Sequence, residues 1–276
     1  ALRTPGSLLP LLVTDRFRPL VNLSYALDYA VWELNPMGYH LTSMALHCLN
    51  VALFFFLCLG LLEDAARLNR GQRSAGIDLF NPGRRRILTS LTMATALAVH
   101  PLLSEGVGYI SGRAEILCAT FFLLAFLGLR RSLLGGGRRW LALGLVALVL
   151  GLGTKELGAM LPLVLLLYDR LILARTEEDP AAARRRLLRL HLPLVGMVLL
   201  AGATRVVALL WFEYDTLPRP VAQNMLMQFS VIWRYLFLVL LPWGQSVVHQ
   251  VRPVTSVADP VALGAGAALA AVITLT

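Results

Sequence analysis

The sequence predicts an all-α, polytopic integral membrane protein. Of its 276 residues, 57% are hydrophobic and only 15% are charged, whereas soluble domains average about 45–50% apolar and about 25% charged residues. The mean hydropathy is +0.69. The apolar residues also come in runs whose length approaches the roughly 20 residues that cross a bilayer as a helix. These observations outweigh the one or two soluble domains that the length alone would suggest.

Residues 1–39 are the more polar part of the chain and are expected to form a loop outside the cytoplasm. Within it, 20–33 reads as an amphipathic helix lying at the membrane interface. Its apolar residues fall roughly on one stripe, which consists of Leu20, Leu23, Leu27 and Val31. A break at 35–38, which contains proline and glycine, ends this helix before the first membrane span.

Residues 40–276 are expected to form a transmembrane helical domain with about eight spans. The apolar runs that predict them are 40–62, 87–103, 114–129, 140–153, 157–173, 192–212, 223–242 and 260–276. The chain begins without a signal peptide and ends while still apolar, so truncation is expected at both ends.

The basic residues predict the orientation. Of 25 basic residues, 24 are arginine and only Lys155 is lysine. Sixteen of them lie in three alternate loops, at 67–86, 130–139 and 170–189, which places these loops in the cytoplasm, with a bacterial inner membrane as the expected location. No basic helix with interleaved aromatics accompanies them, so nucleic acid is not expected as a partner.

Charged residues of both signs remain on the opposite side, where topology does not require them. Charges near the hydrocarbon boundary are costly and usually mark function. Arg113 would oppose the dipole at a helix N-terminus, so we expect it to meet an anion, whereas Glu115 suits that position. Lys155 lies beside Glu156 in a tight turn, where an internal ion pair is the structural alternative to a phosphate ligand.

The histidines have structural alternatives too. His40 and His47 are seven residues apart and therefore share a helix face. The favoured interpretation of His47 is a histidine that only hydrogen-bonds a neighbouring helix. For His40 this structural interpretation and a functional role are equally open. Asp15 and Arg18 lie just before the amphipathic helix, and taken alone this segment is better interpreted as a helix entry with solvated charges.

Together these residues suit a lipid-linked phosphate, because cations stabilise a phosphate leaving group and a carboxylate can take a proton from an incoming hydroxyl. The predicted phosphate-binding set is Arg18, Arg113, Lys155, His40 and His100. The predicted carboxylates are Asp15 and Glu105 for catalysis, with Glu156 and Glu115 in support. No metal-ligand spacing, nucleophilic triad or dinucleotide motif competes, and no cofactor is evident.

Four segments resemble one family in the right order. They are FRPLVNLSYALDYAVWELNPMGYHLTSMALHCLN, HPLLSEGVGYISGRAEIL, TKELGAMLPLVLLLYD and, more loosely, RYLFLVLLPWGQSVVHQVRPV. They are similar to motifs of the transmembrane and tetratricopeptide-repeat-containing (TMTC-like) membrane glycosyltransferases, over roughly 16–260. Phe17 stands where relatives have tyrosine, and Ser43 where they often have asparagine.

The resemblance implies a GT-C fold that uses polyprenyl-phosphate sugars outside the cytoplasm, with a protein or glycan hydroxyl as acceptor and O-glycosylation as the outcome. It also implies that the main catalytic carboxylate precedes Ala1, which leaves Asp15 as a fallback base, and that the repeat domain is absent from this chain. Two alternatives stay open. One is a non-catalytic scaffold or accessory subunit with membrane-protein partners, and the other is a lipid-handling carrier, although no paired halves support the carrier.

Overall fold

The computed structural model describes residues 18–68, 82–176, 180–212, 221–241 and 259–275, with Gly244 and Val254. Every regular element in these residues is a helix, which confirms the predicted fold class. The chain divides into two compact units, 1–99 with 103–203 and 100–102 with 204–276. The candidate site lies in the first unit.

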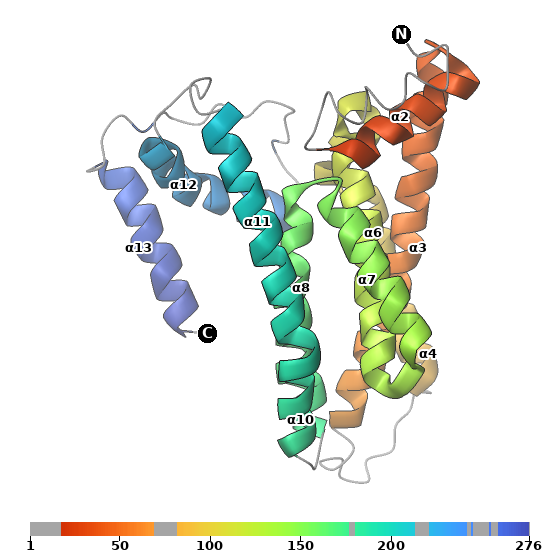
Figure 1. Cartoon of the computed structure of the whole chain (residues 1–276), viewed down its shortest axis with the longest axis vertical. Coiled ribbons are helices and arrows are strands. Elements are labelled where there is room, and N and C mark those ends of the chain that lie inside the picture. Colours follow the sequence, from red (N-terminus) through yellow and green to blue (C-terminus); the bar gives the residue numbers. More distant parts are fainter. Residues whose placement is uncertain are drawn as a thin grey trace. The chain divides into compact units, whose positions relative to one another are not determined.

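The first unit contains most of the helices (Figure 1). In chain order they are α2 (Pro19–Trp32), α3 (Pro36–Leu68), α4 (Pro82–Val99), α5 (Ser104–Gly108), η4 (Ile110–Gly112), α6 (Arg113–Arg131), η5 (Ser132–Gly136), α7 (Arg138–Leu152), η6 (Glu156–Met160), α8 (Leu161–Tyr168), η7 (Asp169–Leu173), α9 (Ala174–Thr176), α10 (Pro180–Arg186), η8 (Leu187–His191) and α11 (Leu192–Phe212) as far as 203.

The eight predicted spans fall largely on helical residues, although 87–103 is interrupted at His100. Three helical stretches of the described chain are long and apolar enough to cross a membrane. These are Pro36–Arg67, Ile110–Gly136 and Ala181–Val207, and a bent pair over Pro82–Gly108 would make a fourth. The protein is therefore an integral membrane protein. The total of eight spans stays a prediction, because several apolar helices such as α7 are shorter than a full crossing.

The expected amphipathic helix is α2, which forms over nearly the predicted range and runs across the end of α3 in Figure 1. Proline at its first position suits a helix start, since that residue needs no hydrogen-bond donor. Val21, Ala26 and Asp28 are buried, whereas Leu27 and Val31 of the predicted stripe are 62% and 73% exposed. The second half of the predicted stripe therefore faces away from the bundle, as expected of an interfacial helix, whereas Leu20 and Leu23 are half-buried.

Helices α6 and α7 form a hairpin at the centre of the first unit. A Cβ added to Gly128 would lie 3.0 Å from the Cα of Gly144, so small residues allow the two backbones to approach closely. The turn between them uses Gly135 and Gly137 at φ +90° and +84°, values that favour glycine. The buried core packed around this hairpin includes Ala125, Phe126, Leu129, Leu148, Leu161 and Leu165.

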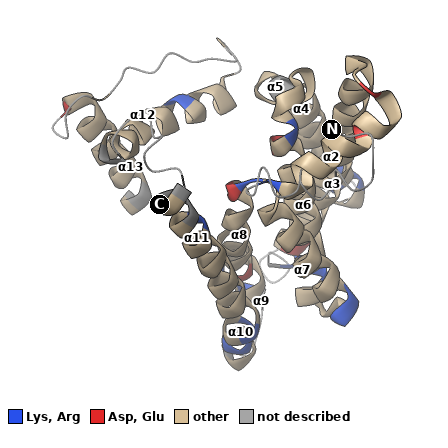
Figure 2. Cartoon of the chain, turned by 45° about the horizontal axis from the view of Figure 1, so that its top comes forward, with Lys and Arg blue, Asp and Glu red and all other residues tan. Residues whose placement is uncertain are grey.

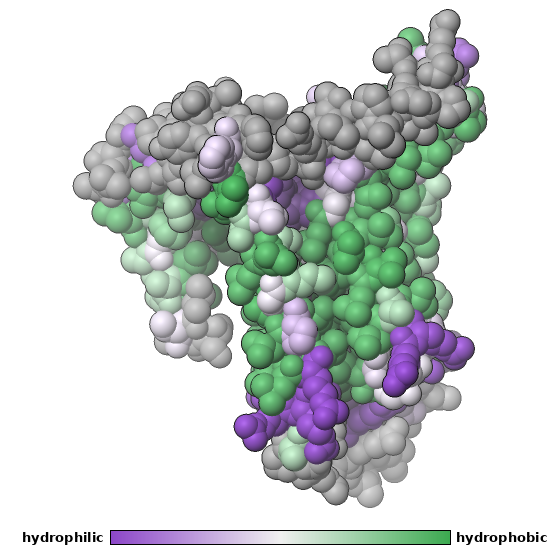
Figure 3. All heavy atoms as spheres, in the orientation of Figure 1, coloured by the Kyte–Doolittle hydropathy of each residue, from purple (hydrophilic) through white to green (hydrophobic). Residues whose placement is uncertain are grey.

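Arginine gathers at α10 and at the start of α7, where Figure 2 shows it in blue. Figure 3 shows a hydrophobic band over the first unit above these hydrophilic residues. We use the name arginine-rich end for the end of the bundle that carries the arginines of α10 and of the start of α7. The pattern is that of a membrane-embedded bundle whose helices end in basic loops.

The arginine-rich end also holds buried polar networks that the sequence did not indicate. Asp64, 1% exposed, accepts hydrogen bonds from Arg130 Nε at 2.8 Å and Tyr168 Oη at 2.6 Å. Arg130 was assigned to a topology-determining loop, but it lies in the last turn of α6 and is buried, because this ion pair satisfies its charge. A second network joins Asp169 to Arg186 and His191.

The second unit contains the later part of α11, then α12 (Val221–Leu240) and α13 (Pro260–Leu275), with η3 (Pro101–Leu103) starting in its short segment 100–102. The indole Nε1 of Trp233 in α12 donates to the carbonyl of Ala265 in α13 at 2.9 Å. Asp259 accepts from the backbone N–H groups of Val261 and Ala262, which caps the start of α13.

Candidate functional site: a charged face at the start of helix α6

Arg113 occupies the first position of α6 and is completely buried. Its Nη1 donates to Asp28 Oδ2 at 2.5 Å, its Nε to Ser43 Oγ at 3.2 Å and its Nη2 to the carbonyl of Tyr39 at 2.7 Å. The ring of Tyr25 lies 5.1 Å from the guanidinium carbon, within the range of a cation–π contact. Each nitrogen of the guanidinium therefore has a partner inside the protein.

The anion expected for Arg113 is thus Asp28, and the ion pair joins the interfacial helix α2 to the bundle. Asp28 is itself 6% exposed, and its other oxygen accepts from Thr42 Oγ1 at 2.7 Å. A buried cation that lost such a partner would be strongly destabilising. In this arrangement Arg113 positions α2 and does not face a ligand, so its predicted contact with the donor phosphate stays a prediction.

Lys155 forms an ion pair with Glu115, one turn into α6. The two side chains are 24% and 50% exposed, so this pair is open to solvent, unlike that of Arg113. The turn before Lys155 is tight, because Thr154 Oγ1 and the Lys155 N–H both contact the carbonyl of Gly151, at 2.6 and 3.3 Å. The internal pair is therefore with Glu115 rather than with the adjacent Glu156.

Arg18 pairs with Glu156 across the same turn, with 3.9 Å between Nη2 and Oε2. The backbone N–H of Leu20 reaches the carbonyl of Gly153 at 3.5 Å, which brings the start of α2 beside this turn. We use the name charge cluster for the four exposed or half-exposed residues Arg18, Glu115, Lys155 and Glu156. They come from three separate segments, and two cations lie among two carboxylates.

Tyr25, which contacts the guanidinium of Arg113, also lines a pocket of about 570 Å³, which we call the aromatic pocket. The pocket is lined by Tyr25, His40, Gly108, Tyr109, Ile110 and Ser111. Tyr25 Oη donates to the carbonyl of Ile110 at 2.6 Å, and His40 Nδ1 lies 3.5 Å from the carbonyl of Val107. Burial raises the pKa of the Tyr25 phenol, so it stays a neutral donor at physiological pH.

The structure thus brings Arg18, Lys155, Glu115 and Glu156 together, and places His40 in the pocket wall. His100 belongs to the second unit, where its Nε2 lies 3.2 Å from the carbonyl of Val239. Asp15 lies outside the described residues, as does the side chain of Glu105. His47 contacts the carbonyl of Ala98 in α4 at 3.2 Å, which confirms the structural interpretation of that histidine.

Sequence reasoning gave no role to Tyr25, Asp28 or Tyr109. Asp28 carried one signal, because it is a charge within an otherwise apolar stretch of the amphipathic helix. Tyr25 and Tyr109 carried none, since aromatic residues are common at membrane interfaces. Within the described ranges, no group of three or more His, Cys, Asp or Glu side chains is arranged to hold a metal ion.

The fold and this face define an integral membrane protein whose bundle ends in an exposed charge cluster beside a pocket. No protein-family model matches the chain and no solved structure matches it. Protein O-mannosyl-transferase TMTC3 of Homo sapiens is 34% identical over 116 residues, which are 42% of this chain and 10% of that protein. Protein O-mannosyl-transferase Tmtc1 of Drosophila melanogaster is 27% identical over 270 residues, 86% of this chain and 28% of the relative.

A third relative, protein O-mannosyl-transferase TMTC1 of Homo sapiens, is 32% identical over 174 residues, 59% of this chain and 17% of that protein. These similarities agree with the resemblance of its motifs to the transmembrane and tetratricopeptide-repeat-containing proteins. It spans between 10% and 28% of the length of these three relatives.

Proposed function

We propose that the chain is the membrane part of a glycosyltransferase that moves a sugar from a polyprenyl-phosphate donor to a protein hydroxyl. Its relatives carry the name protein O-mannosyl-transferase, which supports transfer to a protein. The observation that carries the proposal is the charge cluster, in which two solvent-accessible cations pair with exposed carboxylates. One of these carboxylates, Glu115, acts electrostatically on Tyr25 in the wall of the aromatic pocket. The end of the bundle that carries this cluster would face away from the cytoplasm.

In the proposed reaction the acceptor oxygen attacks the anomeric carbon of the sugar. The bond between that carbon and the donor phosphate oxygen breaks, and the phosphate leaves with the electron pair. A carboxylate takes the acceptor proton, either Asp15 or one preceding Ala1, and the configuration at the carbon inverts. Glu105 would assist from the short helix α5.

Lys155 and Arg18 are the proposed ligands of the departing phosphate. An exposed ion pair contributes only about 0–1 kcal/mol, because water and salt screen it. Each cation can therefore exchange its carboxylate for a phosphate oxygen at small cost. Glu115 and Glu156 would hold the two cations in place between turnovers.

The aromatic pocket is the proposed place for the sugar. Tyr25 and Tyr109 offer ring faces, and His40 and Ser111 offer polar atoms, the mixture that small-molecule pockets use to bind and orient a ligand. The role of His100 as a phosphate ligand stays a prediction. The bacterial inner membrane stays a prediction, since the three relatives come from human and fruit fly.

One observation favours the alternative of a non-catalytic scaffold: both exposed cations already have carboxylate partners on this chain. Pairs of this kind would also form if the cluster only stabilised the turn. Transfer activity distinguishes the two functions.

The test is sugar transfer from a labelled polyprenyl-phosphate donor by the full-length protein in proteoliposomes. Lys155→Ala should lower kcat/KM by about 30- to 1,000-fold, since one transition-state cation contributes about 2–4 kcal/mol. The matched control is Arg85→Ala, which removes an exposed arginine from the first turn of α4. Equal activity in Lys155→Ala and wild type would refute the phosphate assignment, and inactivity of folded wild type with a panel of donors would favour the scaffold.

A further inference from the structure

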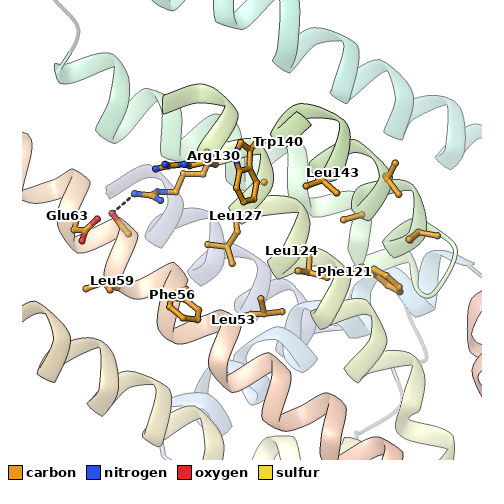
Figure 4. A pocket seen from close by; sticks show the side chains of 16 residues that line it. Leu53, Phe56, Leu59, Glu63, Phe121, Leu124, Leu127, Arg130, Trp140 and Leu143 are labelled. Carbon is orange, nitrogen blue, oxygen red and sulfur yellow. Dashed lines mark hydrogen bonds between the residues drawn. The ribbon is translucent and has the colours of Figure 1, made fainter. Parts of the chain in front are cut away.

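A second cavity, of about 720 Å³, lies between α3, α6 and α7 (Figure 4), and the proposed chemistry makes no use of it. It is lined almost wholly by apolar side chains, among them Phe56, Phe121, Leu124 and Leu143. Leu143 is 58% exposed and Phe56 57%, so the cavity is a groove open to the surroundings of the bundle. In an integral membrane protein those surroundings are lipid.

The length of the groove matches one leaflet of a bilayer. The lining residues extend over 53–63 of α3, 121–131 of α6 and 140–150 of α7. Ten steps of 1.5 Å along each helix give about 15 Å, which is half of the roughly 30 Å hydrocarbon core. A groove of this length suits an acyl chain of one leaflet, whose head lies at one end of the groove.

Polar residues mark which end that is. Figure 4 shows Arg130, Trp140 and Glu63 at one end, while Leu53 and Phe121 lie toward the other. Tryptophan next to basic residues is typical of the level of lipid headgroups. The headgroup end of the groove is therefore the arginine-rich end of the bundle.

The charge at this end is positive and exposed. Arg130 is committed to Asp64 and to the carbonyl of Gly60. Arg131 is exposed in the last turn of α6, and Arg138 and Arg139 are exposed in the first turn of α7. Arg131 and Glu63 both line the groove, and Arg138 and Arg139 directly precede the lining residue Trp140 in the sequence. Exposed positive charge therefore exceeds negative charge at this end of the groove. Arginine is well suited to phosphate, because its planar donors can bind two oxygens together.

We propose that this groove binds one anionic phospholipid, with an acyl chain against α3, α6 and α7 and its phosphate held by Arg131 together with Arg138. The occupant comes from the leaflet at the arginine-rich end. A polyprenyl-phosphate donor fits less well, because its phosphate is proposed at Lys155, beyond the opposite end of α7. The exclusion of the donor rests on the proposed function, whereas the length and the charge of the groove do not depend on it.

Native mass spectrometry of the full chain, released from mixed vesicles of phosphatidylglycerol and phosphatidylcholine, tests the proposal. We expect one retained phosphatidylglycerol at the lower detergent concentrations. The double variant Arg131→Ala with Arg138→Ala should retain it at least tenfold less. The matched control, Arg84→Ala with Arg85→Ala, removes two exposed arginines from the first turn of α4 and should bind as wild type does.

A groove-filling variant separates the acyl chain from the headgroup. Leu143→Trp adds bulk where the side chain is already exposed, so the fold should persist while retention of the lipid falls. In nanodiscs, bromine on the lipid chain should quench Trp140, measured as the difference between wild type and Trp140→Phe. Three results would each overturn the proposal. The first is equal retention of phosphatidylglycerol and phosphatidylcholine by the wild type, and the second is equal retention of phosphatidylglycerol by the two double arginine variants. The third is displacement of the phosphatidylglycerol by a polyprenyl phosphate.

Discussion

The buried ion pair between Asp28 and Arg113 should be the most sensitive point of the charged face. Replacing Asp28 by Asn keeps the shape of the side chain but leaves the guanidinium charge without its counter-ion. Arg113 is 0% exposed, so water cannot replace the lost carboxylate without opening the contact between α2 and the bundle.

The magnitude follows from the geometry. At 2.5 Å and an effective dielectric constant of about 20, the attraction amounts to about 7 kcal/mol, much of which offsets the desolvation of both groups. Removing one partner of a buried pair typically costs 3–5 kcal/mol. Since the amide oxygen of Asn can still accept from Arg113, we expect Asp28→Asn to lower the free energy of unfolding by about 3 kcal/mol.

The assay is reversible unfolding of the purified chain in mixed micelles, with helix content followed as denaturing detergent is added. Glu33→Gln is the matched control, since it neutralises an exposed carboxylate just after α2 and should change stability by no more than about 0.5 kcal/mol. The pair Asp28→Leu with Arg113→Met should lose less than Asp28→Leu alone, because no charge is left buried.

A loss below about 1 kcal/mol for Asp28→Asn, close to that of the control, would refute this reasoning. Arg113 would then tolerate an uncharged neighbour, and its guanidinium would be free to bind the donor phosphate as the sequence suggested. Donor binding measured on the same variant distinguishes the two roles. If Arg113 only positions α2, the variant loses stability, whereas if Arg113 binds the phosphate, the affinity for the donor changes while stability is kept.

Three further results are expected. Tyr168→Phe should cost about 1–2 kcal/mol in the same unfolding assay, because it removes the 2.6 Å hydrogen bond to buried Asp64. Gly144→Ala should cost about 1–3 kcal/mol, since its Cβ would lie 2.9 Å from a backbone nitrogen, whereas Gly196→Ala, with open space around it, should leave stability unchanged or raised. Burial raises the pKa of Tyr25 above 10.0 in the folded state, so stability should fall as the pH rises above about 10, and less so in Tyr25→Phe.

The helices could be predicted from the sequence because hydrophobic length and periodicity are local properties. The amphipathic helix was placed within one residue of α2 at each end, and the predicted spans fall largely on helical residues. The prediction that Arg113 meets an anion rested on the helix dipole and was also local. These features needed no knowledge of which helices are neighbours.

The pairing of the charges could not be predicted, because it depends on contacts between distant segments. Arg113 and Asp28 are 85 residues apart, and Tyr168 and Asp64 are 104 apart. Several carboxylates lay on the predicted side of Arg113, and nothing in their spacing selected Asp28. The partner of Arg130, Asp64, lies in another helix and could not be identified from the sequence either. Arg130 was therefore counted among the loop arginines that determine topology.

The two kinds of cation on the charged face suggest a division of roles. Arg113 is buried and fully bonded, so it holds α2 and the start of α6 in one geometry. Lys155 is 24% exposed and pairs with Glu115, two residues after Arg113 in α6, a carboxylate that it can release at little cost. A site that must bind and release a phosphate in each turnover needs both, because a rigid frame fixes where the exchangeable cation lies. Lys155→Arg should therefore keep the ion pair and the fold, yet lower transfer, since the broader guanidinium presents its charge differently to a single phosphate oxygen.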